Sequence, residues 1–163
     1  MRQILELLER DAQLSHDAIA TMTGLPVAEV SEAIATWEAS GAIRRYKAVV
    51  DWDRVEEDPS RDEVTAFIDV SLAPARGVGF DDVAARIARF DEVRSVYLVS
   101  GSQDLRCTVT GRSIRAVSDF VSQKLSTIDR VRSTATHFVL KTYKRDGDAF
   151  REPDADHRLP VTP

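Results

Sequence analysis

Three cations lie close together at Arg44, Arg45 and Lys47, a spacing that suits contact with a phosphate backbone. Their side chains can neutralise phosphates, and this electrostatic contribution dominates most nucleic-acid binding. The same cluster would also suit the solvated edge of a β-strand, where charges discourage pairing with other chains. The sequence leaves both interpretations open.

The segment before these cations has the opposite charge. Residues 25–40 contain no Lys or Arg, but they contain Glu29, Glu32 and Glu38. Residues 1–47 together hold five Lys and Arg against seven Asp and Glu. We therefore expect nucleic-acid binding by one copy to be weak, so that several copies in one assembly would have to supply avidity.

The hydrophobic spacing of the first fifty residues predicts three short helices that position these charges. Apolar residues fall on one helical face over residues 2–10. Ser15 is suited to cap a second helix, and Gly24 to a tight turn, because glycine accepts a positive φ. The third helix is expected to end at Gly41, and a strand to follow at residues 43–50. The second helix is expected to run through Ala18, Ile19 and Met22, and the third carries Val30, Ala33, Ile34 and Trp37 at helical spacing.

This order of elements is typical of a winged or extended helix-turn-helix, a DNA-binding motif, over residues 1–50. A small three-helix bundle without a DNA role is the alternative. In a DNA complex, Ala and Val can touch a thymine methyl, Ser can reach a base edge, and Glu can accept from cytosine N4. The candidate DNA-binding residues are therefore Val27, Ala28, Ser31, Glu32 and Ala35 at the bases, and Arg44, Arg45 and Lys47 at the phosphates.

Residues 64–143 switch repeatedly between strand and helix patterns. Residues 64–72 alternate apolar and polar side chains, which predicts a half-buried strand. Phe67 is the apolar exception among the residues on the polar side of this strand. The other expected elements are helices at 80–90 and 113–125 and strands at 93–99, 105–109 and 131–143.

An internal repeat relates the two halves of this region. The segment DEVRS at residues 91–95 recurs as DRVRS at residues 129–133, an offset of 38. In each copy a helix feeds a strand through the same short turn, so the chain reads βαβ twice. This predicts an α+β fold with a ferredoxin-like βαββαβ sheet and both helices on one face. Because a largely apolar open face rarely stays in water, we expect a second copy to cover it and form at least a dimer.

A helix-turn-helix, a linking strand and a βαββαβ domain, in this order, resemble the Lrp/AsnC family of leucine-responsive, feast/famine regulators. The motifs that carry the resemblance are I-L-x-L-L-x-x-D-A-x-L-S near the start, the turn T-G-L, G-A-I-R-R-Y-K-A-V-V-D after the third helix, and V-Y-L-V-S-G-S-Q-D at 96–104. The resemblance covers about residues 1–145. It implies a DNA-binding transcriptional regulator whose C-terminal, RAM-type domain dimerises and often assembles four dimers into a ring.

The resemblance also implies a small effector, usually an amino acid, in a cleft between dimers. Backbone N–H groups of the lining loop can hold a carboxylate, and Asp104 can accept from an ammonium or instead bond its own backbone in a turn. Family members usually carry an aromatic residue where this chain has Gln103, which changes the expected size and polarity of the pocket. The implied effector-binding residues are Ser100, Gly101, Ser102, Gln103 and Asp104, with Thr134 and Thr136 on the facing last strand.

Two other functions compete with this interpretation. Siroheme decarboxylases resemble the same layout and use His and Arg side chains, and Arg106 with Thr108 and Thr110 could bind a carboxylate here. A sensor module that has lost DNA binding would explain the acidic third helix. No Ser-His-Asp order, metal-ligand spacing or phosphate-binding Gly loop is present, so we expect no enzyme, metal or cofactor. The histidines available are His16 at the second helix, His137 in the last strand and His157 near the end.

The composition favours a cytoplasmic protein. Cys107 is the single cysteine, which excludes an internal disulfide and a Cys-clustered metal site. No apolar run approaches the ~18 residues of a membrane span, and the charged N-terminus is unlike a signal peptide. The net charge of −5 argues against a generic nucleic-acid coat. We expect a linker at residues 51–63 and a flexible tail at 144–163, with Phe150 and Leu159 as its large apolar side chains.

Overall fold

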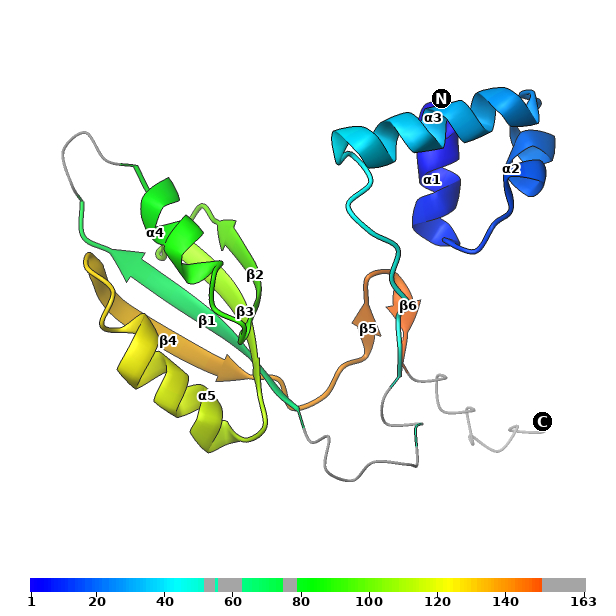
Figure 1. Cartoon of the computed structure of the whole chain (residues 1–163). Helices are drawn as coiled ribbons and strands as arrows, with labels where there is room; N and C mark the ends of the chain where they lie inside the picture. Colours follow the sequence, from blue (N-terminus) through cyan, green and yellow to red (C-terminus); the bar gives the residue numbers. More distant parts are fainter. Residues whose placement is uncertain (52–54, 56–62, 75–78, 151–163) are drawn as a thin grey trace, which may run out of the picture. The chain divides into compact units, whose positions relative to one another are not determined.

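The chain divides into two compact units (Figure 1), and most of the predicted linker between them lies outside the described residues. The units comprise residues 1–50 and 51–163, and the computed structural model describes residues 1–51, 55, 63–74 and 79–150.

The first unit contains three helices: α1 (Arg2–Arg10), α2 (His16–Thr23) and α3 (Val27–Ser40). Ser15 caps α2, because its Oγ accepts a hydrogen bond from the Ala18 N–H at 3.1 Å. Gly24 after α2 and Gly41 after α3 adopt left-handed conformations with φ of 71° and 74°, which glycine tolerates without steric cost. The predicted caps and turn are therefore confirmed. The core between the helices is Ile4, Ile19, Ala20, Val30 and Ile34, with Ala33 and Trp37 packed against it.

Helix α2 contains Ala18, Ile19 and Met22 as predicted; it buries Ile19 and Ala20, and the Met22 side chain is 57% exposed. One prediction for this unit is wrong, because residues 43–50 form no β-strand. A strand requires a hydrogen-bonded neighbouring strand, and the sheet of the second unit is built from four strands that do not include this segment.

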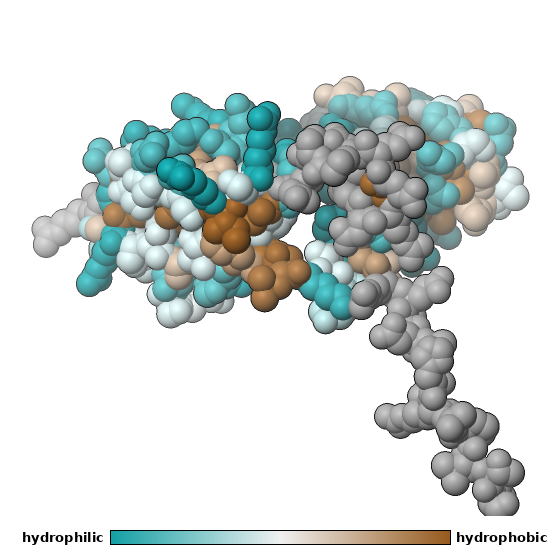
Figure 2. All heavy atoms as spheres, turned by 90° about the horizontal axis from the view of Figure 1, so that it is seen from below, coloured by the Kyte–Doolittle hydropathy of each residue, from teal (hydrophilic) through white to brown (hydrophobic). Residues whose placement is uncertain are grey.

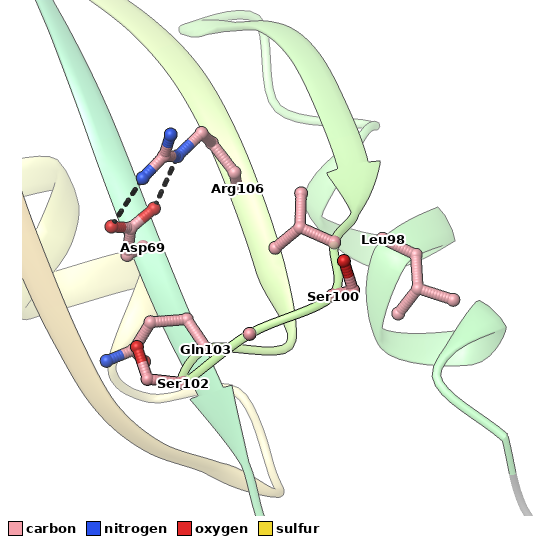
Figure 3. Close-up of a pocket in the computed structure, with 8 residues that line it drawn as sticks. Asp69, Leu98, Ser100, Ser102, Gln103 and Arg106 are labelled. Carbon is pink, nitrogen blue, oxygen red and sulfur yellow. Dashed lines mark hydrogen bonds and ion pairs between the residues drawn. The ribbon is translucent and has the colours of Figure 1, made fainter.

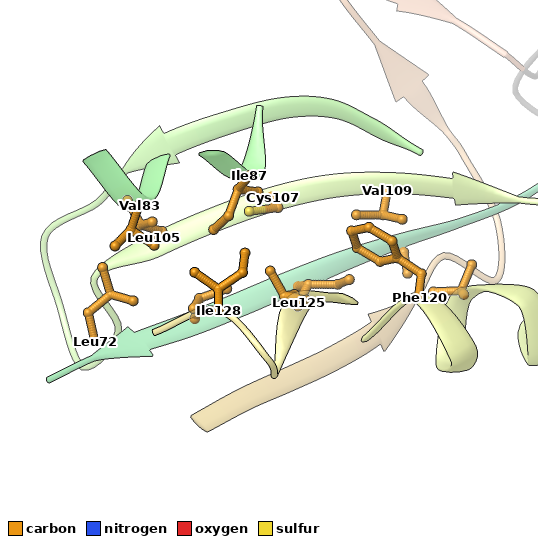
Figure 4. Close-up of a cluster of buried hydrophobic side chains, with 13 residues drawn as sticks. Leu72, Val83, Ile87, Leu105, Cys107, Val109, Phe120, Leu125 and Ile128 are labelled. Carbon is orange, nitrogen blue, oxygen red and sulfur yellow. The ribbon is translucent and has the colours of Figure 1, made fainter. Parts of the chain in front are cut away.

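The second unit is built on a four-stranded sheet in the order β2-β3-β1-β4, with every neighbouring pair antiparallel. Two helices and a short π-helical turn pack on one face of the sheet, which confirms the predicted ferredoxin-like βαββαβ fold (Figures 1 and 4). The elements are β1 (Val64–Leu72), α4 (Asp81–Ile87), β2 (Val93–Leu98), β3 (Leu105–Gly111), α5 (Ile114–Phe120), η2 (Val121–Leu125) and β4 (Val131–Phe138).

The core of this unit lies between the helices and one face of the sheet (Figure 4). Strand β1 shows how the sequence specifies it, because Ala66, Ile68 and Val70 are fully buried while Phe67 is 43% exposed on the other face. The core residues from the other elements include Val83, Ile87, Leu105, Cys107, Val109, Val117, Phe120, Leu125 and Ile128.

The internal repeat is visible in the hydrogen bonds of the two helix-to-strand turns. In the first copy, the Phe90 N–H donates to the Ile87 carbonyl at 3.2 Å, and the Val93 N–H donates to the Phe90 carbonyl at 3.0 Å. The same two bonds recur 38 residues later, from Ile128 to Leu125 at 3.2 Å and from Val131 to Ile128 at 3.1 Å. The repeated sequence therefore encodes a repeated turn.

The last strand of the sheet is shorter than predicted. It ends at Phe138 rather than at residue 143, and the Leu140 side chain that follows is 96% exposed. Neighbouring β1 begins at Val64, so the sheet offers little ladder beyond this point.

A two-stranded hairpin occupies the start of the segment expected to be a flexible tail. It pairs β5 (Lys144–Arg145) with β6 (Asp148–Ala149). The turn residues Asp146 and Gly147 have φ of 52° and 98°, the two positive values that a tight hairpin turn requires. Residues 144–149 of the expected tail form this hairpin, and Leu159 lies outside the described residues.

Within the described part of the chain, no helix is both long and apolar enough to cross a membrane. Hydrophobic surface is nevertheless present, and Figure 2 shows it gathered on one side of the sheet-containing unit. The large exposed apolar side chains of that unit are Val55, Phe67, Tyr97, Leu98, Ile114, Leu140 and Tyr143.

Candidate functional site

The open face of the sheet, opposite α4 and α5, carries most of the polar strand side chains. On β1 this face presents Phe67, Asp69 and Ser71, and the antiparallel register sets Arg106 of β3 directly opposite Asp69. The expectation of a largely apolar open face is therefore wrong. Its polar side chains bond to one another across strands, as in Ser95 with Thr108 at 2.8 Å and Arg94 with Thr110 at 2.9 Å.

Asp69 and Arg106 point toward one another from β1 and β3 (Figure 3). The Arg106 Nε donates to Asp69 Oδ1 at 2.7 Å, and its Nη2 donates to Oδ2 at 2.9 Å. These hydrogen bonds hold the pKa of Asp69 below its usual range and raise the pKa of Arg106, so both groups are charged at neutral pH. Asp69 is buried under this bidentate pair at 7% exposure, and His137 Nε2 lies 3.6 Å from its Oδ2.

A cavity of about 550 Å³ lies beside this ion pair (Figure 3). The Arg106 side chain is 53% exposed, so part of its guanidinium remains available to a carboxylate ligand. Leu98 points away from the ion pair in the same view and is 61% exposed. The cavity is lined by Asp69, Leu98, Val99, Ser100, Gly101, Ser102, Gln103 and Arg106.

The loop between β2 and β3 is tied to β1 by side-chain hydrogen bonds. Gln103 Oε1 accepts from the Ser71 hydroxyl at 2.8 Å, and Asp104 Oδ2 accepts from the Leu72 N–H at 2.7 Å. The sheet register shifts between Ser71 and Leu72, and the Asp104 carboxylate satisfies the backbone N–H at that irregularity. Gly101 has a φ of 143°, a conformation that favours glycine. The end of the loop next to β3 is therefore tied to β1 by two hydrogen bonds.

The structure brings four of the predicted effector residues together and separates the others. Ser100, Gly101, Ser102 and Gln103 line the cavity, whereas the Asp104 carboxylate is committed to the Leu72 backbone. Thr134 and Thr136 of β4 lie opposite Val70 and Ile68, which places them on the helix-covered side of the sheet and away from this cavity.

Four cavity residues, Asp69, Leu98, Val99 and Arg106, are absent from the predicted effector set, although the enzyme alternative considers Arg106 as a carboxylate ligand. Asp69 carries a signal that sequence reasoning could use, because it is the single charged residue within the strand sequence VTAFIDVSL. An acid at that place needs a partner, and the cross-strand arginine supplies it.

The candidate DNA-binding residues lie on the surface of the first unit. Val27, Ala28, Glu32 and Ala35 of α3 are exposed, and so are Arg44, Arg45 and Lys47. The segment that carries these cations is tied to α3 by the Tyr46 hydroxyl, which donates to Glu38 Oε1 at 2.9 Å. One of the three glutamates of α3 therefore accepts a hydrogen bond beside the basic cluster.

Ser31 differs from the other base-reading candidates because it is half-buried. Its Oγ lies 2.8 Å from His16 Nδ1 at the start of α2, within hydrogen-bonding distance. This contact joins the two helices of the helix-turn-helix on their exposed side.

The groups that could perform other chemistry are scattered or buried. Among the residues that the structure describes, no group of three or more His, Cys, Asp or Glu side chains could hold a metal ion. Cys107 is fully buried in the sheet core, and burial raises the pKa of its thiol to about 11. His137 lies on the open face with a 61% exposed side chain.

Comparison with known proteins agrees with this architecture. Residues 65–149 match the family model of the Lrp/AsnC ligand binding domain. The chain is 48% identical over 161 residues to an uncharacterized HTH-type transcriptional regulator, YugG, of Bacillus subtilis, which covers 99% of this chain and 95% of the relative.

Solved structures with the same fold include two complexes with L-methionine. A transcriptional regulator from Neisseria meningitidis in complex with L-Met aligns with a TM-score of 0.67 at 25% identity, covering 88% of this chain and 89% of the other. The feast or famine regulatory protein from M. tuberculosis complexed with L-methionine aligns with a TM-score of 0.70 at 26% identity, covering 92% and 96%.

The helix-turn-helix unit, the βαββαβ sheet with its loop-lined cavity and these matches lead to one assignment: the chain belongs to the Lrp/AsnC family of DNA-binding transcriptional regulators that respond to a small effector.

Proposed function

We propose that this protein binds DNA through α3 and the cation cluster at residues 44–47, and that an α-amino acid in the loop-lined cavity controls this binding. The observation that best supports an effector site is the Arg106 side chain, which is half exposed beside a loop of small and polar residues. Two structural relatives hold L-methionine, which supports an amino acid as the class of ligand.

The cavity offers different chemistry to each part of an amino acid. The ligand carboxylate would bind Arg106 and the backbone N–H groups of residues 100–103. Neighbouring Val99 supplies apolar contact for a side chain. Gln103 also lines the cavity, but its Oε1 already accepts a hydrogen bond from the Ser71 hydroxyl. This oxygen is therefore less available to a ligand.

A thermal-shift screen against the common amino acids tests the effector site. Wild-type protein should show a raised melting temperature with at least one amino acid, because a ligand that binds only the folded state stabilises it. Arg106→Gln should lose this shift, and the pair Asp69→Asn with Arg106→Gln should lose it without leaving a buried unpaired carboxylate. Arg115→Gln on α5, outside the cavity, is the matched control and should keep the shift. A shift retained by both Arg106 variants would place the effector elsewhere.

The DNA half of the proposal depends on Arg44, Arg45 and Lys47, since residues 11–43 contain no Lys or Arg. Fluorescence anisotropy with the protein's own upstream DNA measures affinity as a function of salt. Arg45→Ala should weaken binding to specific and unrelated DNA alike and reduce the salt slope by about 1. Arg10→Ala at the end of α1 serves as a charge-matched control. An unchanged slope in Arg45→Ala would remove the cation cluster from the interface.

We further propose that the protein is a cytoplasmic homodimer that associates into a tetramer or octamer, and that it catalyses no reaction. Phe67 and Tyr97, 43% and 59% exposed on the open sheet face, support association through that face. The enzyme alternative has its own test, because siroheme binding would change the absorbance spectrum of the mixture. Regulation without DNA binding, as a pure sensor, is the outcome if upstream DNA fails to bind.

A further inference from the structure

The base-reading role assigned to Ser31 conflicts with the hydrogen bond that this residue makes. Its hydroxyl lies 2.8 Å from His16 Nδ1, although the two residues are fifteen positions apart in the sequence. A hydroxyl held by an imidazole is no longer free to turn toward whichever base edge comes near. The exposed polar group at this place is the histidine ring itself.

The ring has one nitrogen left for a ligand. His16 Nε2 makes no hydrogen bond within the described part of the chain, and the side chain is exposed at the first residue of α2. If the Ser31 hydroxyl donates to Nδ1, then Nε2 carries a hydrogen and can donate outward. Ser31 can thus set both the tautomer and the direction of the imidazole.

The position on α2 indicates what the ring would meet. In a helix-turn-helix complex the second helix of the motif enters the major groove, while the first crosses the sugar-phosphate backbone. Here α2 is the first helix and α3 the second, and residues 11–43 contain no Lys or Arg to contact phosphate. The His16 ring is therefore the side-chain nitrogen donor that α2 offers to DNA.

We infer that His16 contacts a DNA phosphate through Nε2, and that Ser31 orients this ring instead of reading a base. The inference rests on the proposed DNA binding. A phosphate contact fixes the position of the protein on the duplex and carries no sequence information, so it should strengthen binding to all sequences alike. Ser31 then acts as a positioning residue, through His16.

Anisotropy measurements on full-length protein with upstream DNA and with an unrelated duplex of equal length test this inference. His16→Ala should weaken binding to both duplexes by the same factor, about two- to tenfold for one hydrogen bond. His16→Gln, which keeps a side-chain donor, should recover part of the loss. Ser31→Ala should weaken both in the same way but less, and adding it to His16→Ala should cause no further loss.

Thr36→Ala is the matched control for Ser31→Ala, since it also removes an exposed hydroxyl from α3, where Thr36 bonds the Glu32 carbonyl at 2.8 Å. It should bind as the wild type does. Binding by His16→Ala that equals the wild type would overturn the inference while leaving the proposed function intact. A change in sequence preference in Ser31→Ala that persists without His16 would restore Ser31 as a base reader. Wild-type protein that binds neither duplex would overturn both proposals.

Discussion

At the residue scale, Asp69 combines burial with charge. It is 7% exposed, yet the two hydrogen bonds from Arg106 keep its carboxylate ionised. Burial by itself raises the pKa of this carboxyl, because it disfavours the charged form, and the hydrogen bonds from Arg106 outweigh that effect. The pair therefore both stabilises the sheet and leaves a guanidinium edge at the cavity.

Acid should weaken the fold through this pair. The pKa of Asp69 is lower in the folded chain than in the unfolded one, so its stabilisation is fully present above about pH 4 and is lost as the pH falls through the folded-state pKa. Glu92, whose pKa is lowered by its hydrogen bond from Lys124, acts in the same direction. Urea unfolding between pH 3 and 7 measures the effect.

Asp69→Asn should show a smaller fall in unfolding free energy on acidification than wild type does. Asp119→Asn, at an exposed acid on α5, should retain the wild-type pH dependence. Equal acid sensitivity in wild type and Asp69→Asn would show that the Asp69–Arg106 pair is not the source of the acid-dependent stability.

Cys107 should be inert in the native protein. Its side chain is fully buried and its thiol pKa is raised to about 11, so almost no reactive thiolate exists at neutral pH. A colorimetric disulfide reagent at pH 8 should modify it slowly in buffer and rapidly in denaturant. Rapid modification of the native chain would show that the sheet core opens readily.

At the element scale, the loop between β2 and β3 owes its shape to Asp104. Because the Asp104 carboxylate accepts from the Leu72 N–H at 2.7 Å, the loop follows β1 at the place where the register shifts. The resemblance of the sequence to a regulator family assigned this acid to an effector. In the structure, the Asp104 carboxylate instead accepts from the backbone N–H of Leu72, a contact that the spacing of residues in the sequence does not indicate.

Asp104→Ala should destabilise the protein by about 1.5–3 kcal/mol, the usual range for a hydrogen bond to a charged group. Asp104→Asn, which keeps an acceptor oxygen, should lose less. Urea unfolding gives the free energies, and amide hydrogen exchange at Leu72 reports the bond directly. Unaltered protection of the Leu72 amide in Asp104→Ala would show that this amide does not depend on the hydrogen bond to Asp104.

The elements that the sequence predicts well are those specified by local patterns. Alternation along residues 64–72 predicts β1 with its buried face, and the repeat at 91–95 and 129–133 predicts two equivalent turns. Residues 43–50 have strand-like composition but form no strand, and β4 stops at Phe138. Strand pairing depends on a neighbour elsewhere in the chain, which composition alone does not provide. The cavity is a similar case, since Asp69 and Arg106 meet only through the β1–β3 register.

At the scale of the whole molecule, the net charge of −5 and the acidic α3 limit what one copy can do on DNA. Several copies would repeat the cation cluster at residues 44–47 along a duplex, and linked weak sites gain affinity without new contacts. Light scattering coupled to size-exclusion chromatography should therefore give a mass of at least two chains of 18.1 kDa. A mass of one chain at micromolar concentration would contradict the proposal that linked copies of the protein strengthen DNA binding.

The most direct test of a DNA-binding regulator controlled by an amino acid is the affinity of wild-type protein for its own upstream DNA at ~50 mM salt, a condition that favours phosphate contacts. It should be measured with and without the amino acid that raises the melting temperature. We predict measurable binding with a modest dependence on salt, and an affinity that changes when the amino acid is added, since an effector must couple to DNA binding by a finite free energy. Absence of binding under both conditions would contradict the account and leave a sensor that carries a helix-turn-helix fold.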